Sequence, residues 1–187
     1  ARTIRLAFRI AQEGRPGPVL IDVPKDVTVE YAEYERQVIE PMKPRSDRIS
    51  EQALSAALEL IHSAERPVCF VGGGVVRARA SKELTEFIEK IDAPVCASMM
   101  GIGAIPTTST RYTGMVGMHG TKVSNMIVSM CDLLIVIGSR FSDRVVSKAS
   151  AFARGANIIH IDVDPAEIDK NITATVGIVG DVRIVLK

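Results

Sequence analysis

The chain has 187 residues, of which 47% are hydrophobic and 24% charged, which is enough apolar material for one full domain and part of another. Its 23 Lys and Arg nearly balance 22 Asp and Glu, so the net charge of +1 argues against nucleic acid or an anionic membrane as partner. No apolar run reaches the roughly 18 residues of a membrane span, and the start lacks a signal peptide. These features predict a soluble, cytoplasmic protein.

The first 26 residues predict a helix, a turn and a strand. Ile4, Phe8 and Ala11 recur at helical spacing, residues 14–18 form a Gly/Pro turn cluster, and residues 19–23 predict a short buried strand. The chain opens in a helical pattern without an initiator Met, so we expect a piece of a longer protein.

A polar stretch over residues 27–47, which contains Pro41 and Pro44, predicts a linker between domains. The second domain then covers residues 48–187. It starts with a helix capped by Ser50, whose apolar stripe runs from Ala53 to Ile61.

Strands and helices alternate through the rest of this domain. We expect strands at 68–71, 95–98, 133–137, 158–163 and 176–179, and helices near 78–91, 122–130, 145–153 and 166–170. Near-continuous Val, Ile and Leu strands between helices indicate a parallel sheet that is covered on both faces. The fold class is therefore α/β, with a doubly wound, mostly parallel, Rossmann-like sheet.

Three cysteines, Cys69, Cys96 and Cys131, lie far apart in apolar, strand-like runs. An odd number in such surroundings predicts reduced, buried thiols rather than a disulfide or a zinc site.

Polar, Gly-bearing segments lie at the ends of several predicted strands or open the loops between elements. They occupy residues 117–121, 138–145 and 161–167. In an open parallel sheet, ligands bind outside the carboxyl ends of the strands. The three segments therefore predict one shared site for a nucleotide-like cofactor.

The Gly72-Gly73-Gly74 run follows the first strand of the domain and has two interpretations. Glycines there let a backbone approach a pyrophosphate, but they also suit a tight strand-to-helix turn. The spacing is not G-x-G-x-x-G, so the local sequence leaves both open.

Two arginines, Arg140 and Arg144, lie four positions apart and would share a face if this segment were helical. Two guanidiniums there could bind phosphate or carboxylate, and the alternative is that they pair with Asp143 or other surface carboxylates.

The acidic residues near the end of the fourth predicted strand of the sheet divide into two roles. Asp162 could accept hydrogen bonds from ribose hydroxyls, as acidic residues at strand ends do in this fold class. Asp164 fits a helix N-cap, with Pro165 at the first helical position and Glu167 placed to reach back.

The chain has three histidines, and only one lies in a candidate site. His119 is flanked by Gly117 and Gly120, which favours contact with a cofactor over proton transfer. His62 and His160 suit structural roles in a helix and a strand.

Together these segments resemble the large catalytic subunit of acetolactate synthase, a thiamine diphosphate enzyme of branched-chain amino-acid biosynthesis. The resemblance covers essentially the whole chain and is carried by residues 14–26, 72–74, 100–106, 117–121, 140–144 and 162–171. It implies that residues 48–187 are the central, FAD-binding domain and that residues 1–26 are the end of the preceding, pyrimidine-binding domain. Ser142 departs from the family, which generally has Asp there, and Ser98-Met99 replace the commoner Thr-Leu.

The resemblance also implies which residues contact FAD. These positions are Arg15, Gly73, Gly74, Ser98, Met99, Met118, His119, Gly138, Arg140, Arg144, Asp162, Val163 and Asp181. Met118, Asp143 and Arg144 match positions near the substrate channel, where an arginine would orient a pyruvate carboxylate. No catalytic residue and no metal ligand is expected in this chain.

By the same resemblance, the intact enzyme would condense two pyruvates, or pyruvate and 2-oxobutyrate, with release of CO₂. Thiamine diphosphate and Mg²⁺ would be bound by domains outside this chain, so the chain alone would be inactive. A homodimer or tetramer of catalytic subunits and a small regulatory subunit are expected. The alternatives are a related enzyme (pyruvate oxidase, glyoxylate carboligase or catabolic acetolactate synthase) and a non-catalytic module that binds NAD or another nucleotide.

Overall fold

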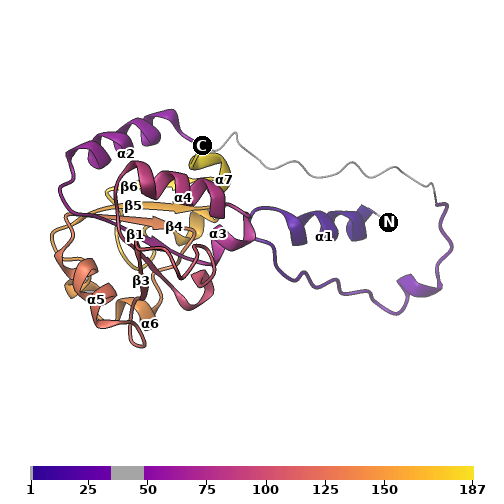
Figure 1. Ribbon diagram of the computed structural model, residues 1–187. Coiled ribbons are helices and arrows are strands. Elements are labelled where there is room, and N and C mark those ends of the chain that lie inside the picture. The colour runs from indigo at the N-terminus through magenta and orange to yellow at the C-terminus, as the bar shows by residue number, and fades with distance from the viewer. Residues whose placement is uncertain (1, 35–48) are drawn as a thin grey trace. The chain divides into compact units, whose positions relative to one another are not determined.

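The computed structural model describes residues 2–34 and 49–187 (Figure 1). The chain divides into two compact units, residues 1–45 and 46–187. The linker expected over residues 27–47 lies outside the described residues from position 35 onward. Its described part contains a single 3₁₀ turn, η1 (Val27–Val29).

The first unit contains one helix, α1 (Arg2–Gln12), as the spacing of its apolar residues predicts. The chain then turns at Gly14, whose φ of +59° favours glycine. The strand predicted over residues 19–23 is wrong, because this segment pairs with no described residue and its side chains are exposed. A strand exists through its hydrogen bonds to a neighbour, and the described part of the chain supplies none here.

The second unit is built on a sheet of six strands that all pair in parallel. Their order in the sheet is β3-β2-β1-β4-β5-β6. The strands are β1 (Pro67–Val71), β2 (Val95–Ala97), β3 (Tyr112–Met115), β4 (Leu133–Ile137), β5 (Asn157–Asp162) and β6 (Val176–Val179). The chain winds outward from β1 to β3, returns to β4 beside β1, and winds outward again to β6. This is the doubly wound Rossmann order, and the predicted fold class is confirmed.

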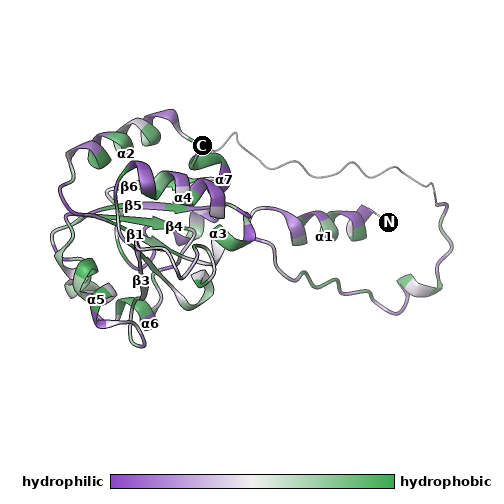
Figure 2. Ribbon diagram, viewed as in Figure 1, coloured by the Kyte–Doolittle hydropathy of each residue, from purple (hydrophilic) through white to green (hydrophobic). Residues whose placement is uncertain are grey.

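Helices cover both faces of this sheet (Figures 1 and 2). The helices of the second unit are α2 (Glu51–Ser63), α3 (Gly73–Arg77), α4 (Ser81–Lys90), α5 (Lys122–Met130), α6 (Asp143–Val146) and α7 (Val182–Val185). Three 3₁₀ turns, η2 (Met99–Gly101), η3 (Ala149–Ala151) and η4 (Pro165–Glu167), complete the connections. Ser50 caps α2 as predicted, since its hydroxyl accepts a hydrogen bond from the Ala53 amide at 3.3 Å.

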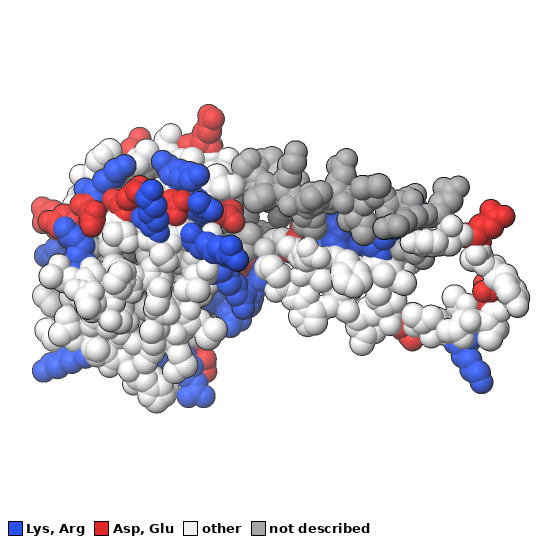
Figure 3. Space-filling model, turned by 45° about the vertical axis from the view of Figure 1, so that its right-hand side comes forward, with Lys and Arg blue, Asp and Glu red and all other residues white. Residues whose placement is uncertain are grey.

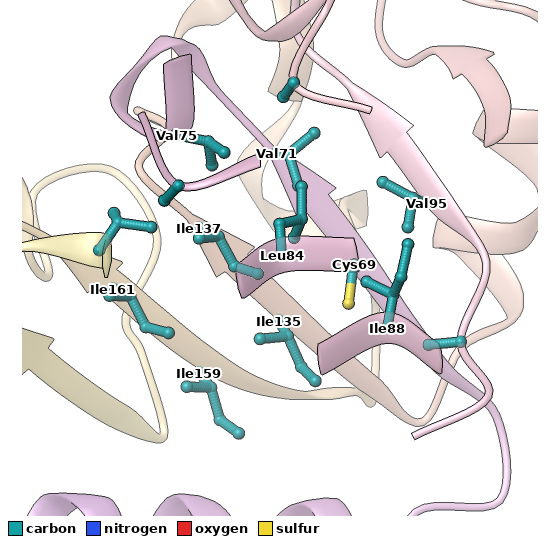
Figure 4. Close-up of a cluster of buried hydrophobic side chains, with 14 of the residues drawn as sticks. Cys69, Val71, Val75, Leu84, Ile88, Val95, Ile135, Ile137, Ile159 and Ile161 are labelled. Carbon is teal, nitrogen blue, oxygen red and sulfur yellow. The ribbon is translucent and has the colours of Figure 1, made fainter. Parts of the chain in front are cut away.

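Two apolar clusters form the core, one on each face of the sheet. Cys69 and Val71 of β1 pack with residues of α2, α3, α4 and α7, and Figure 4 shows much of this cluster. Val68 and Phe70, which alternate with them along the same strand, pack with residues of α5 and α6 on the other face. The central strands are therefore buried on both faces, which explains their nearly continuous apolar sequence.

The three cysteines are buried and free, as expected. Burial raises the pKa of the Cys69 thiol, that of Cys96 to about 12, and that of Cys131 to about 11. These thiols stay protonated at neutral pH and are poor nucleophiles. No helix within the described residues is long and apolar enough to cross a membrane.

Three helix predictions need correction. The helix expected over 78–91 begins only at Ser81, because Arg79 adopts a φ of +53° between α3 and α4. The helix expected over 145–153 is interrupted at Ser147, whose φ of +52° ends α6. The helix expected over 166–170 is reduced to the single turn η4. A residue with positive φ cannot continue a right-handed helix.

Candidate functional site

The candidate site lies along the carboxyl edge of the parallel sheet. Because all six strands run in the same direction, the segments that follow them emerge at one edge. Predicted cofactor contacts follow every strand. In strand order they are Gly73 and Gly74 after β1, Ser98 and Met99 after β2, Met118 and His119 after β3, Gly138 and Arg140 after β4, Asp162 and Val163 at the end of β5, and Asp181 after β6.

Arg15 is the one predicted contact in the other unit of the chain. Its side chain is exposed, and its place beside FAD stays a prediction.

Glycines bring the loops after β1 and β4 into direct contact. The Gly74 amide donates to the Gly138 carbonyl oxygen at 2.9 Å, and a Cβ on Gly74 would lie 2.6 Å from the Gly138 Cα. A Cβ on Gly72 would lie 2.3 Å from the same carbonyl oxygen. β1 and β4 are the neighbours from which the chain winds in opposite directions, the usual ligand position in this fold class. The tight-turn interpretation of these glycines thus has a structural basis, and their contact with a ligand stays a prediction.

The segment after β2 packs closely on the end of β1. The Ser98 amide donates to the Val71 carbonyl oxygen at 2.9 Å, and a Cβ on Gly101 would lie only 2.3 Å from that oxygen. Met99 stays 66% exposed, although it is a large apolar side chain. An exposed, flexible thioether at this edge is suited to pack against a flat ring.

The structure brings Met118 and Arg144 together across 26 positions of sequence. The Met118 amide donates to the Arg144 carbonyl oxygen at 2.9 Å, and Arg144 Nη1 lies 3.8 Å from Met118 Sδ. Gly117 permits this contact, because its φ is +100° and a Cβ on it would lie 2.5 Å from the Arg144 carbonyl oxygen. Met118, its neighbour His119 and Arg144 are all exposed and can meet a ligand.

The expected shared face of Arg140 and Arg144 is not found. Helix α6 starts only at Asp143, so Arg140 precedes it and Arg144 lies within it. Ser142 occupies the N-cap position but its side chain makes no capping hydrogen bond. The Asp143 carboxylate lies 4.0 Å from Arg144 Nε, at the limit of an ion pair between two exposed side chains. Arg140 is exposed, and its guanidinium can take an anion independently of Arg144.

Asp162 is a buried carboxyl group at the end of β5. Its Oδ1 accepts a hydrogen bond from the Asp164 amide at 2.9 Å, and burial raises the pKa of this carboxyl group. Asp164 caps η4 as predicted, since its Oδ1 accepts from the Ala166 amide at 3.0 Å. The neighbouring Glu167 forms an ion pair with Lys170 at 3.2 Å.

His160 and Asp181 have structural roles that the contacts make plain. His160 is fully buried in β5, with Nε2 at 2.9 Å from the Ser139 carbonyl oxygen and its ring 5.0 Å from that of Phe141. Asp181 caps α7 by accepting a hydrogen bond from the Arg183 amide at 2.8 Å. The role of Asp181 toward FAD stays a prediction.

The sequence did not predict the contacts of two asparagines. Asn125 forms two hydrogen bonds with the main chain of Gly117, and Asn171 donates from Nδ2 to the Phe141 carbonyl oxygen at 2.6 Å. The available signal for Asn125 was its residue type, because Asn is unfavourable inside a helix unless its amide has a partner elsewhere.

On the face that Figure 3 shows, positive and negative side chains are mixed. In the view of Figure 3, charged side chains of both signs gather in a band across the top of the larger unit, and most of the face below carries other residues. Within residues 2–34 and 49–187, no group of three His, Cys, Asp or Glu side chains is arranged to hold a metal ion.

Comparison with known proteins places these features in a family. A family model described as "Thiamine pyrophosphate enzyme, central domain" matches residues 54–187. A probable acetolactate synthase large subunit of Methanocaldococcus jannaschii is 48% identical over 99% of this chain and 32% of that protein. The acetolactate synthase large subunit of Haemophilus influenzae is 38% identical over 99% of this chain and 33% of that protein. The chain thus spans about a third of the length of these curated relatives.

A solved structure agrees with the sequence comparisons. It is that of a putative thiamin diphosphate-dependent enzyme from Mycobacterium smegmatis, with a TM-score of 0.75 and 26% sequence identity. The likeness covers 99% of this chain and 35% of that one.

Proposed function

The chain belongs to the thiamine pyrophosphate enzyme family, whose central domain it carries, and on that premise we propose that it is part of an acetolactate synthase large subunit. The intact protein would condense two pyruvates, or pyruvate and 2-oxobutyrate, with release of CO₂. Thiamine diphosphate, bound with Mg²⁺ by other domains, would supply the carbanion chemistry of this reaction. The second unit, with residues 48–187 as its proposed domain, would bind FAD.

One observation carries the FAD proposal. The positions proposed to contact FAD in the second unit lie at or after the carboxyl ends of all six parallel strands, and Arg144 is joined to this edge through Met118. A ligand that reaches all these segments must be long, as a dinucleotide is.

The side chains at this edge fit the parts of a flavin nucleotide. The Asp162 carboxyl group at the end of β5 suits ribose hydroxyls, and the exposed Arg140 guanidinium suits a phosphate. The exposed thioethers of Met99 and Met118 suit the flat face of a ring. Burial disfavours the charged form of Asp162, and a hydroxyl group of a ligand that donates a hydrogen bond would stabilise this charged form.

The proposed substrate channel lies where Met118 and Arg144 meet. The Arg144 guanidinium would orient the carboxylate of a 2-oxo acid, and Met118 would limit the space beside it. Asp143, which lies 4.0 Å from Arg144 Nε, would help to hold the guanidinium in place. In the intact protein we further propose a homodimer or tetramer of catalytic subunits, a small regulatory subunit and a cytoplasmic location.

The test is a titration of the intact protein with FAD, and separately with NAD, followed by flavin fluorescence and thermal stability. We expect selective FAD binding, weakened about tenfold by Arg140→Ala because a charged phosphate contact is lost. Arg154→Ala is the matched control, since Arg154 is an exposed arginine just before the amino end of β5. Tight binding of NAD without FAD would favour a nucleotide-binding module instead.

A second assay separates the related enzymes. Pyruvate consumption with formation of 2-acetolactate in the presence of bound FAD is expected for the proposed enzyme. Oxidation of pyruvate, use of glyoxylate, or full activity without FAD would favour pyruvate oxidase, glyoxylate carboligase or catabolic acetolactate synthase in turn.

A further inference from the structure

Asn125 of α5 binds both polar groups of the Gly117 main chain. Its Oδ1 accepts a hydrogen bond from the Gly117 amide at 2.9 Å, and its Nδ2 donates to the Gly117 carbonyl oxygen at 3.1 Å. The preceding residue, Val116, still donates to Ala97 at the end of β2. Gly117 is therefore the first residue beyond the hydrogen bonds that join β3 to β2. The Asn125 carboxamide makes the two hydrogen bonds that a neighbouring strand would otherwise make with Gly117.

The main chain of Asn125 is itself held firmly. Its amide donates to the Thr121 carbonyl oxygen at 3.1 Å, and Ser129 Oγ donates to the Asn125 carbonyl oxygen at 2.8 Å. Thr121 Oγ1 caps the helix by accepting from the Ser124 amide at 3.0 Å, and Ser124 is fully buried. The carboxamide thus projects from a fixed helix start rather than from a loop.

The residues around Gly117 form a closed loop. The Gly120 amide donates to the Gly117 carbonyl oxygen at 2.9 Å, and the Thr121 amide donates to the Met115 carbonyl oxygen at 2.8 Å. Gly117 also lies against the main chain of Arg144, to which the next residue, Met118, donates. The position of Gly117 therefore decides where Met118, His119 and Arg144 lie relative to one another.

We propose that Asn125 is a positioning residue of the flavin and substrate site, which acts by holding the Gly117–Gly120 loop through its two hydrogen bonds to Gly117. This inference rests on the proposed function, because Met118, His119 and Arg144 are the residues proposed to meet FAD and substrate. In this role Asn125 acts through its hydrogen bonds to Gly117 and determines the arrangement of the groups that meet the ligands.

The decisive variant is Asn125→Asp, which keeps the shape of the side chain and replaces its NH₂ donor by oxygen. As a carboxylate, the new side chain accepts from the Gly117 amide but faces the Gly117 carbonyl oxygen without a proton to donate. As a neutral acid it regains one donor and one acceptor, the pattern of asparagine. Asn125→Ala lacks both bonds at every pH.

We expect Asn125→Asp to bind FAD about tenfold more weakly than wild type at pH 8, and to recover toward wild type as the pH falls toward about 4, because an aspartic acid side chain becomes neutral only near that pH. Asn125→Ala should be weakened by a similar factor at both pH values. The matched control is Asn157→Asp, because Asn157 is exposed at the amino end of β5, opposite the candidate site. It should follow wild type throughout.

Other ionisable groups lie near Asn125. They are His119 in the loop, Lys122 on the same helix, Asp143 and Arg144 of α6, and Lys148, which lines a cavity of about 340 Å³ together with Asn125 and Gly117. All are present in wild type, so each variant is compared with wild type at the same pH. Circular dichroism and thermal melting establish that each variant is folded.

Amide hydrogen exchange gives a reading that does not depend on FAD. At pH 8 the Gly117 amide should exchange at least tenfold faster in Asn125→Ala, which lacks the Oδ1 acceptor, than in wild type, with α5 itself unchanged. Folded Asn125→Asp that binds FAD like wild type, or that is weakened equally at pH 8 and pH 4, would overturn the inference.

If the proposed function is wrong, the wild-type protein itself gives a different result in the FAD titration. If folded wild type binds no FAD, the FAD proposal fails, and with it the flavin part of the role of Asn125. The hold of Asn125 on the loop is then decided by hydrogen exchange alone, and equal rates at the Gly117 amide in wild type and Asn125→Ala would contradict it.

Discussion

His160 Nε2 lies 2.9 Å from the main-chain carbonyl oxygen of Ser139, so a fully buried side chain of β5 holds the segment that follows β4 through a hydrogen bond. A carbonyl oxygen only accepts, and Nε2 must therefore carry the proton of the neutral ring. Nδ1 is buried and has no hydrogen-bond partner among the described residues. A second proton would have to be placed on Nδ1, where nothing described accepts it.

The first prediction concerns the pH dependence of stability. Burial lowers the pKa of His160 in the folded protein, whereas the unfolded chain keeps the ordinary value near 6.5. Below that value the unfolded state binds more protons than the folded state, so the free energy of unfolding should fall as the pH drops from about 6.5. His160→Gln should remove this part of the pH dependence, and urea unfolding of both proteins between pH 7.5 and 5 measures it.

Asp162 changes the free energy of unfolding with pH in the opposite direction to His160, and at lower pH. Burial raises the pKa of its carboxyl group above the ordinary value of 3.8, so the contribution of this group to the free energy of unfolding declines as the pH rises above 3.8. The comparison of His160→Gln with wild type at each pH isolates the histidine, because Asp162 is common to both. An unchanged slope in the variant would contradict the assignment.

The second prediction is that Asp162→Asn separates stability from binding. The amide keeps an acceptor for the Asp164 amide and removes a carboxylate that burial disfavours, so the free energy of unfolding at pH 7 should stay the same or rise. FAD binding should weaken about fivefold, because a neutral acceptor holds ribose hydroxyls less strongly. Asp164→Asn is the control: asparagine caps a helix equally well, so neither quantity should change.

The third prediction tests the contact between the loops after β1 and β4. Gly74→Ala should lower the free energy of unfolding by about 2 kcal/mol or more, because its Cβ would lie 2.6 Å from the Gly138 Cα and the two backbones must separate. Gly17→Ala should change stability by less than about 1 kcal/mol, since a Cβ there meets nothing within 4 Å. Chemical denaturation of both variants checks the difference, and equal midpoints would show that the loops can move apart.

The fourth prediction concerns the arginine that contacts Met118. Arg144→Lys should raise the KM for pyruvate about tenfold in the intact protein, because an ammonium group lacks the planar pair of donors that a carboxylate accepts. Affinity for FAD should fall much less. Steady-state kinetics with saturating FAD makes the measurement, with Arg154→Ala as the control. A KM that stays at the wild-type value would remove Arg144 from the substrate channel.

The sequence predicted the strands of the sheet that contain an apolar run. β4 and β6 agree fully with the predicted strands, and β1, β2 and β5 agree to within one residue at each end, because their apolar runs stand between clear helix signals. β3 was missed. It contains Thr113 and Gly114 and its side chains are only half-buried, so its sequence lacks such a run.

The sequence predicted that the segments of the candidate site share one edge of the sheet, as the strand order shows, but not the contacts between these segments. Strand ends identified the segments, because parallel strands deliver them to one edge. The contact between Met118 and Arg144 depends on positive φ at Gly117 and on the early end of α6 at Ser147, and neither follows from residue type alone. Asn125 was missed because its partner is a main-chain group, so that the unusual residue type inside a helix was the one available signal.

The pairing of β1 with β4 also bears on how this unit folds. Its register joins Pro67 to Leu133, with β2, β3 and their helices between them in the chain. Asp132 accepts hydrogen bonds from the Glu65 and Arg66 amides at 2.7 and 2.9 Å, and Gly74 bonds to Gly138 at the other end. Closing so long a segment costs entropy before any of these bonds form. We therefore expect this pairing to limit the folding rate, so that changes at Asp132 would slow refolding more than they speed unfolding.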